Sequence, residues 1–234
     1  MLTFILAEAA LETVPENLWS HPAIRRHSKR QNKVPKQLLL DRSFHHSAMN
    51  QLKANDKRGR PDISHFVLLE ALGSPLNKEG LLQIYVHIYN DYVITVNPST
   101  RLPRNCIRFN GLMEQLFQLR KVPSEGETLL KLEQKTLPQL IADINPDYVL
   151  AFSKEGKPKT IQDAVWPLKL KQRPLVMVGG FAHGHFLDTT SQLANEIVSV
   201  DVEMLEAWTV TSRIIYEYEK SLSLPTKRFS ALSK

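Results

Sequence analysis

The stretch Pro174-Leu-Val-Met-Val-Gly-Gly-Phe-Ala-His-Gly184 decides the fold of this chain. Its first half, Leu175 to Val178, has the length and the branched side chains of a strand buried on both faces. The glycines that follow allow a tight turn and let a ligand lie against bare main chain. We therefore expect a strand and a glycine loop at the carboxyl edge of an open α/β sheet, where ligands bind. The alternative is a sharp turn that binds nothing.

The spacing of these glycines excludes two common nucleotide-binding motifs. It matches neither G-x-G-x-x-G nor G-x-x-x-x-G-K-[ST], so neither a dinucleotide nor a P-loop nucleotide is supported. The ligand must be of another kind.

The composition indicates a soluble protein with a polyanionic partner. A chain of 234 residues suffices for one large α/β domain, or for one domain with an insertion. Its formal net charge of +6 favours a polyanion. The single cysteine, Cys106, excludes an internal disulfide or a cysteine-based metal cluster and fits a reducing compartment. Residues 1–10 resemble a strand more than a signal peptide, and no run approaches the roughly 20 apolar residues of a membrane span.

Basic residues occur in three groups. The first lies on an expected exposed helix or loop, which is either a solvated face or a binding surface. Its members are Arg25, Arg26, Lys29, Arg30, Lys33 and Lys36.

The second basic group, Lys57-Arg-Gly-Arg60-Pro-Asp62, directly precedes a helix-patterned run over residues 63–72. Pro61 and Asp62 suit the entry of that helix. Asp62 is either the helix N-cap or a functional carboxylate, and the pattern leaves both open.

The third basic group is Arg101-Leu-Pro-Arg104-Asn-Cys-Ile-Arg108, which leads into an amphipathic helix ending near Leu119. With Pro103 in the first helical turn, Arg104 and Arg108 would share one face of the helix. Guanidinium groups at a helix N-terminus suit phosphates.

Three strands of the last third of the chain are expected to end in loops, which would meet at one edge of the sheet. A two-residue hairpin signal, Asn90-Asp91, joins strands over 81–89 and 92–96. The pattern also predicts strands over 1–10, 128–133, 148–152, 175–178 and 196–200, a buried strand end at 38–40, helices over 43–53, 137–144 and 201–220, and a flexible tail over 221–234.

Four motifs together resemble a known family. They are Lys57-Arg-Gly-Arg-Pro-Asp-Ile63, Gly73-Ser-Pro-Leu-Asn77, Asn97-Pro-x-Thr-Arg-x-Pro-Arg-x-x-x-Arg-Phe109 and Val178-Gly-Gly-Phe-Ala-His-Gly184. In this order the chain is similar to the archaeal-type ribosome-biogenesis pseudouridine N1-methyltransferases of the SPOUT superfamily. The resemblance implies an α/β fold with a parallel sheet, helices on both faces, a family-specific inserted extension and a deep trefoil knot. It implies one domain over 1–220, with RNA-binding elements at about 57–109 and a cofactor-binding knot at about 148–220.

The resemblance also implies a cofactor, S-adenosylmethionine, with S-adenosylhomocysteine as its product. The cofactor would lie in a bent pose among the three loops that follow the carboxyl-terminal strands. The residues expected to bind it are Phe152, Ser153, Val178, Gly179, Gly180, Gly184, Ser199, Val200, Leu205 and Ala207.

The implied substrate is a pseudouridine in a loop of small-subunit ribosomal RNA. Pseudouridine carries a ring N–H at N1, so methylation needs N1 held in line with the sulfonium methyl and its proton lost. By resemblance, Arg60 and Asp62 are the catalytic residues that contact the flipped base, with Asp62 as hydrogen-bond acceptor or general base. The residues expected to bind RNA are Arg58, Arg60, Arg101, Arg104 and Arg108.

Two other functions remain open. One is a ribosome-assembly factor in which RNA binding is essential and methyl transfer dispensable; the other is methylation of ordinary uridine or another base. The implied partners are small-subunit ribosomal RNA, a second copy of the chain, and ribosomal proteins or other assembly factors, in the cytoplasm, or in the nucleolus of a eukaryote. No metal is expected, because the histidines lack the spacing of zinc ligands. No membrane partner is expected either.

Overall fold

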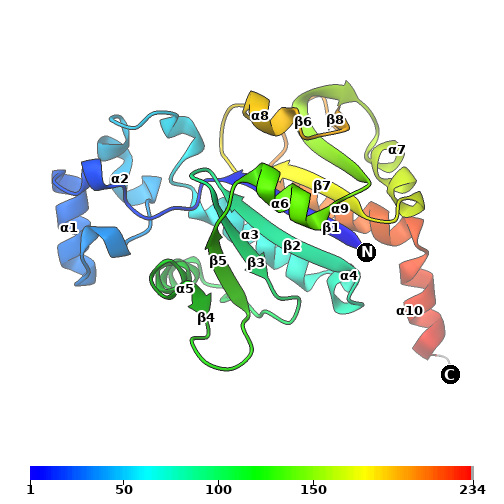
Figure 1. Ribbon diagram of the computed structural model, residues 1–234, viewed down its shortest axis with the longest axis horizontal. Coiled ribbons are helices and arrows are strands. Elements are labelled where there is room, and N and C mark those ends of the chain that lie inside the picture. Colours follow the sequence, from blue (N-terminus) through cyan, green and yellow to red (C-terminus); the bar gives the residue numbers. More distant parts are fainter. Residues whose placement is uncertain (233–234) are drawn as a thin grey trace.

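The sheet of the computed structural model, which describes residues 1–232, has eight strands. They are β1 (Leu2–Ala9), β2 (Leu82–Ile88), β3 (Tyr92–Val96), β4 (Lys121–Val122), β5 (Leu130–Gln134), β6 (Tyr148–Pro158), β7 (Pro174–Gly179) and β8 (Glu196–Ser199). Their order is β4-β5-β3-β2-β1-β7-β6-β8, with β1 near the centre (Figure 1).

The sheet is mixed, so the expectation of a parallel sheet is wrong for one edge. Strands β2, β1, β7, β6 and β8 pair in parallel. β3, β5 and β4 pair antiparallel with their neighbours. The cause is the hairpin that the sequence predicts, which reverses the chain. Its loop is one residue longer than expected, because Ile88 of β2 pairs with Tyr92 of β3 and leaves residues 89–91 between them.

Helices cover both faces of the sheet (Figure 1). They are α1 (Pro22–Gln31), α2 (Arg42–Met49), α3 (Pro61–Gly73), α4 (Pro75–Lys78), α5 (Cys106–Leu119), α6 (Leu137–Ile144), α7 (Ile161–Val165), α8 (Asp188–Ser191), α9 (Ala207–Ser221) and α10 (Leu224–Leu232). Short 3-10 turns occupy Glu16–Leu18, Pro35–Gln37, Asn55–Lys57 and Trp166–Leu170. None of the helices described over residues 1–232 is long and apolar enough to cross a membrane.

Side chains of the central strand alternate between two apolar clusters. Phe4 and Leu6 of β1 pack into the cluster that includes α3, α5 and α9. Ile5 and Ala7 pack into the cluster on the other face, with α6. This alternation is what burial of a strand on both faces requires.

Several boundaries differ from those expected. Residues 38–40 are buried but form only one isolated bridge, between Thr13 and Leu39. β6 continues beyond Phe152 to Pro158, because a register shift lets its second half pair with β8 again. α9 begins at Ala207 and not at Asp201.

Two of the differences concern the residues just before α9 and those after it. Residues 201–206 do not join α9, since the Asp201 carboxylate accepts the Glu203 N–H at 3.1 Å and holds a turn instead. The expected flexible tail contains α10, whose Leu224 is buried against the core. The last two residues of that tail lie outside the described part of the chain.

An inserted unit lies between β1 and α3 and has its own apolar cluster, at the left of Figure 1. It contains α1, which carries Arg25, Arg26, Lys29 and Arg30 of the first basic group, all exposed, whereas Lys33 and Lys36 follow the helix. Lys33 joins the unit to α5 through an ion pair with Glu114.

A pair of histidines links the two helices of this unit. His45 is fully buried, and its Nδ1 accepts the Asp41 N–H at 3.0 Å. Its Nε2 therefore carries the proton and donates to Nδ1 of His27, 2.8 Å away. Burial lowers the pKa of His45 to about 4 and also lowers the pKa of His27.

We predict that the inserted unit loses stability in acid. The folded pKa of His45 lies below its ordinary value of 6.5, so its contribution is complete above pH 6.5 and is lost as the pH falls through about 4. The full loss is about 3 kcal/mol. Hydrogen exchange of α1 and α2, corrected for intrinsic rates, should show less protection at pH 4 than at pH 7. His45→Gln should weaken this dependence, and His46→Gln, an exposed neighbour, should leave it; equal effects would contradict the assignment.

Candidate active site

A cavity of about 140 Å³ lies where β6, β7 and β8 reach their connections. Its walls come from three segments: residues 152–154 of β6, the loop after β7, and residues 198–207 between β8 and α9. Ile63 of α3 and Val210 of α9 complete the lining. The three loop segments are the ones that the sequence predicts to meet.

All the expected cofactor residues except Gly180 line this cavity. Gly180 instead fastens the loop to β1, because its N–H donates to the Ala7 carbonyl and its carbonyl accepts the Ala10 N–H, both at 2.8 Å. A Cβ at Gly180 would lie 2.7 Å from Cα of Ala9. Gly184 has φ +90°, which favours glycine. Whether these residues bind a cofactor stays a prediction at this point.

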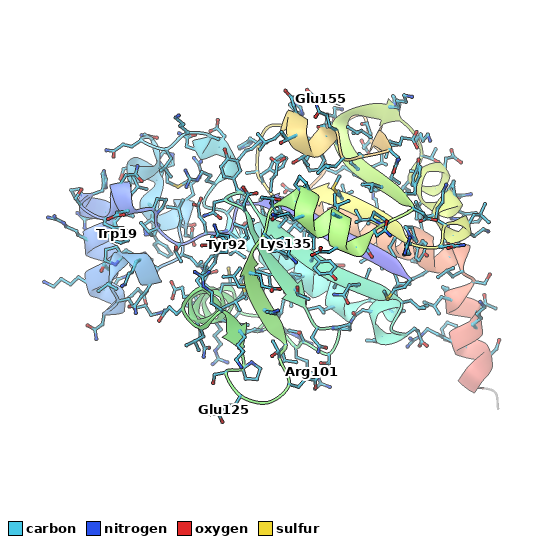
Figure 2. The ribbon with its side chains drawn as sticks, in the orientation of Figure 1. Trp19, Tyr92, Arg101, Glu125, Lys135 and Glu155 are labelled. Carbon is cyan, nitrogen blue, oxygen red and sulfur yellow. The ribbon has the colours of Figure 1, made fainter. Side chains whose placement is uncertain are left out.

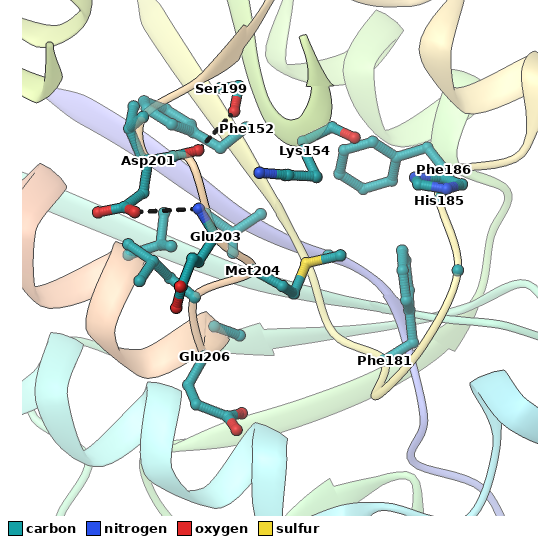
Figure 3. A pocket seen from close by; sticks show the side chains of 18 of the residues that line it. Phe152, Lys154, Phe181, His185, Phe186, Ser199, Asp201, Glu203, Met204 and Glu206 are labelled. Carbon is teal, nitrogen blue, oxygen red and sulfur yellow. Dashed lines mark hydrogen bonds between the residues drawn. The ribbon is translucent and has the colours of Figure 1, made fainter. Parts of the chain in front are cut away.

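The sequence did not single out several other side chains of the cavity. Phe181 and Phe186 form an aromatic wall with ring centroids 5.8 Å apart, and Met204 extends toward them across the cavity (Figure 3). The acidic residues Asp201, Glu203 and Glu206 also line it. Met204 and these carboxylates lie within the segment from Ser199 to Ala207 that the resemblance assigns to the cofactor, but no motif distinguishes them there.

Arg60 and Asp62 form a bidentate ion pair at the start of α3. Arg60 Nε donates to Asp62 Oδ1 at 2.8 Å, and Arg60 Nη2 donates to Oδ2 at 2.7 Å. The hydrogen bond to Asp62 raises the pKa of Arg60, and the charges of Glu206 and Asp41 add to this. Arg60 itself is the N-cap residue, and no side chain caps the helix, so the N-cap role considered for Asp62 is wrong.

This ion pair lies near both the cavity and the third basic group. Of its neighbours, Ile63 and Glu206 line the cavity. Toward the basic group, burial raises the pKa of the Cys106 thiol, and the nearby carboxylates of Asp62 and Asp41 raise it further. Cys106 lies between Arg104 and Arg108 in the chain.

The third basic group is fixed to α3 through His65. The Nε2–H of this buried histidine donates to the Pro103 carbonyl at 2.7 Å. α5 begins only at Cys106, because the Asn105 side chain caps it by accepting the Arg108 N–H. Pro103 is therefore outside the helix, and the expectation that Arg104 and Arg108 share a helix face is wrong.

Arg101, Arg104 and Arg108 are exposed, and none forms an ion pair with another residue of the described chain. Arg101 lies near the lower edge of the molecule in Figure 2, whereas Glu155, next to the cavity residue Lys154, lies near the upper edge. A ligand that touches both regions must therefore be large.

Arg58 differs from these arginines. Its Nε and Nη2 both donate to the Glu12 carboxylate at 2.6 Å, and its side chain is 13% exposed. This ion pair fastens residues 57–60 to the end of β1. Direct contact between Arg58 and RNA stays a prediction, but the observed contact is a structural one.

The fold and the site together define a class of protein. It is an α/β protein with a small-ligand cavity at the carboxyl edge of its sheet, bordered by an arginine–carboxylate pair and then by free arginines suited to phosphates. Within residues 1–232, no group of three or more His, Cys, Asp or Glu side chains is arranged to hold a metal ion.

Comparison with known proteins gives the family. Residues 4–219 match the family described as EMG1/NEP1 methyltransferase. The chain is 47% identical to the ribosomal RNA small subunit methyltransferase Nep1 of Thermococcus kodakarensis, over 96% of this chain and 100% of that protein. It is 46% identical to Nep1 of Pyrococcus furiosus, over 93% and 96%. The chain belongs to the EMG1/NEP1 methyltransferase family.

A solved structure agrees with this assignment. The crystal structure of Archaeoglobus fulgidus Nep1 bound to S-adenosylhomocysteine is 37% identical and superposes with a TM-score of 0.84. The match covers 94% of this chain and 98% of that one.

Two neighbouring glycines of the cavity loop should respond differently to alanine. In Gly180→Ala the new Cβ meets the backbone of Ala9, which cannot move, so we expect the free energy of unfolding to fall by about 1–3 kcal/mol. In Gly179→Ala it meets only the Phe181 ring, which can rotate, so the loss should be smaller. Urea unfolding of both variants measures the difference, and equal losses would contradict the packing described.

Proposed function

We propose that this protein transfers a methyl group from S-adenosylmethionine to N1 of a pseudouridine in a loop of small-subunit ribosomal RNA, in ribosome biogenesis. The observation that carries the proposal is the position of the Arg60–Asp62 pair, near both the cavity and the free arginines. Family membership and the S-adenosylhomocysteine bound to the Archaeoglobus fulgidus relative support the cofactor.

The cavity fits this cofactor chemically. Phe152, Phe181 and Val198 offer apolar surface to an adenine ring, and the carboxylates of Asp201 and Glu203 suit the positive ammonium and sulfonium groups. Gly179 and Gly184 let main chain approach a ligand closely. When bound, S-adenosylmethionine supplies an activated methyl group.

Asp62 and Arg60 divide the work on the base. Pseudouridine N1 carries a proton that must leave as the new N–C bond forms, and the Asp62 carboxylate is the acceptor we assign to it. Arg60 uses Nε and Nη2 to orient this carboxylate, and its Nη1 is left to donate to a carbonyl of the base. Both side chains are about one-third exposed, so a base reaches them without rearrangement of the core.

The arginine segment holds the RNA. Arg101, Arg104 and Arg108 are placed to bind phosphates of a single-stranded loop while one base is turned out toward Asp62. His65 keeps this segment against α3 and hence at a fixed distance from the ion pair. In this proposal the arginines hold the phosphates of the extruded nucleotide and the ion pair holds its base.

Two further properties of the family are proposed for this chain. α3 is apolar on both of its sides, and Phe66 of α3 and Tyr216 of α9 remain 44% and 56% exposed, so a second copy of the chain would cover them in a homodimer. Size-exclusion chromatography with light scattering tests the dimer.

The second property is the knot. β7 lies between β1 and β6 while β8 lies beyond β6, a crossing order compatible with a trefoil knot over residues 148–220.

Transfer of labelled methyl to two RNA hairpins tests the proposed function. The hairpins are identical except that one carries pseudouridine where the other carries uridine. Transfer to the pseudouridine hairpin alone is the expected result. Equal transfer to both would favour a uridine methyltransferase, and tight binding of both without transfer would favour an RNA-binding assembly factor.

Asp62→Asn should lower the methyl-transfer rate at saturating substrates by about 100-fold or more, because the amide cannot take the N1 proton. The affinity for S-adenosylhomocysteine, measured by calorimetry, should change less than about threefold, since the side chain does not line the cavity. Asp143→Asn, on α6 at the other face of the sheet, is the matched control. Equal losses of rate and cofactor affinity in Asp62→Asn would rule out the role assigned to this carboxylate.

Replacing Arg101, Arg104 or Arg108 by Gln should weaken RNA binding by a similar amount for every hairpin sequence. Each substitution should also reduce the slope of log Kd against log salt concentration by about 0.7, the value for one phosphate contact to a single strand. Fluorescence anisotropy over a salt series measures both. Lys131→Gln, on β5, is the control with an exposed cation that already faces Glu133; an equal change of slope in that variant would show that the effect is not local.

A further inference from the structure

Glu8 is a buried carboxylate that contacts two segments far from it in the sequence. Its side chain is 1% exposed. Its Oε2 accepts from Lys57 Nζ at 2.8 Å, and its Oε1 accepts the Leu187 N–H at 2.7 Å. The backbone at Glu8 has φ +52°, within the register irregularity of β1, so a bulge turns this side chain toward its partners.

Lys57 contacts the cavity loop directly. Its ammonium group donates to the His185 carbonyl and lies 4.4 Å from the centroid of the Phe181 ring. A Cβ at Gly184 would lie 3.3 Å from Cε of Lys57, so the lysine side chain lies close to the backbone of the loop. Phe181, Gly184 and His185 all line the cavity.

The same lysine begins the segment that ends at Arg60. This segment is fastened to the end of β1 by the Arg58–Glu12 ion pair and by the Arg60 N–H, which donates to the Ala10 carbonyl at 3.1 Å. Lys57 is therefore the residue of the segment that touches both the cavity loop and the buried carboxylate. A change in the position of the loop must be accommodated by Lys57, and through it by Arg60.

We propose that the Glu8–Lys57 ion pair is a positioning pair that couples occupancy of the cavity to RNA binding. The inference rests on the proposed function, since it takes the cavity as the cofactor site and Arg60 as a contact to the base. A ligand that orders the loop at Phe181 and His185 restricts Lys57 and so holds Arg60 and Asp62 ready for the nucleotide. The coupling is reciprocal, because RNA must then strengthen cofactor binding by the same factor.

The test measures the dissociation constant of the pseudouridine hairpin with and without saturating S-adenosylhomocysteine. For the unaltered protein we expect the ratio of the two constants to be about fivefold or more. Calorimetry of S-adenosylhomocysteine with and without the hairpin should give the same ratio.

The informative variant is Glu8→Gln/Lys57→Met. It removes both charges at once and so leaves no unpaired charge in the interior. We expect both ligands still to bind and the ratio to fall below about twofold. Lys57→Arg keeps the charge and the donors and should retain a ratio closer to that of the unaltered protein.

Glu12→Gln/Arg58→Met is the matched control, because it likewise removes both charges of a buried pair. It breaks an equally buried ion pair that fastens the same segment but has no contact with the cavity loop. RNA affinity should fall in this variant, whereas the ratio should stay within about twofold of the original. A merely structural role of Glu8 and Lys57 would alter both affinities and leave the ratio unchanged.

Two results would overturn the inference. One is a ratio near 1 in the unaltered protein, which needs no variant and stands even if the double variant fails to fold. The other is an unchanged ratio in the folded double variant. Failure of the unaltered protein to bind S-adenosylhomocysteine at all is distinguishable, because it would overturn the proposed function together with the inference.

Discussion

Two buried carboxylates, one near the end of the central strand and one just after it, hold the site together. Glu8 of β1 binds Lys57, and Glu12, three residues after β1, binds Arg58; both partners lie just before Arg60 in the chain. Removing one partner of such a buried pair typically costs 3–5 kcal/mol, because the other charge is left uncompensated. The pairs therefore fix the segment that carries Arg60 relative to the sheet, and the sheet in turn fixes the cavity.

The site works as one unit because three chain segments of different kinds meet there. The carboxyl-terminal strands supply a cavity with aromatic and acidic walls, α3 supplies the Arg60–Asp62 pair, and the segment before α5 supplies arginines free to bind phosphates. His65 joins the last two through the Pro103 carbonyl. Ile63, which lines the cavity, directly follows Asp62 in the chain, so a ligand in the cavity lies next to the ion pair.

Much of this arrangement could be predicted from the sequence, for identifiable reasons. The strand and loop over 174–184, the hairpin at Asn90-Asp91 and the helix Leu137–Ile144 follow from local patterns of apolar residues, glycine and proline. What failed depends on contacts between distant residues or on capping. The Asn105 cap sets the late start of α5, and renewed pairing with β8 sets the length of β6. The Glu8–Lys57 pair joins two residues that are 49 positions apart in the chain. The resemblance assigns Gly180 to the cofactor site with the rest of its loop, and the packing of Gly180 against β1 depends on a residue far away in the chain.

The central claim is that the target base binds against the Arg60–Asp62 pair with its N1 facing the methyl donor in the cavity. A crystal structure of the protein with S-adenosylhomocysteine and a pseudouridine hairpin tests it most directly. The account predicts the cofactor product in the cavity, the extruded base against Asp62 with N1 facing the sulfur, and phosphates on Arg101, Arg104 and Arg108. A base bound away from Asp62, or a cofactor product outside the cavity, would contradict it.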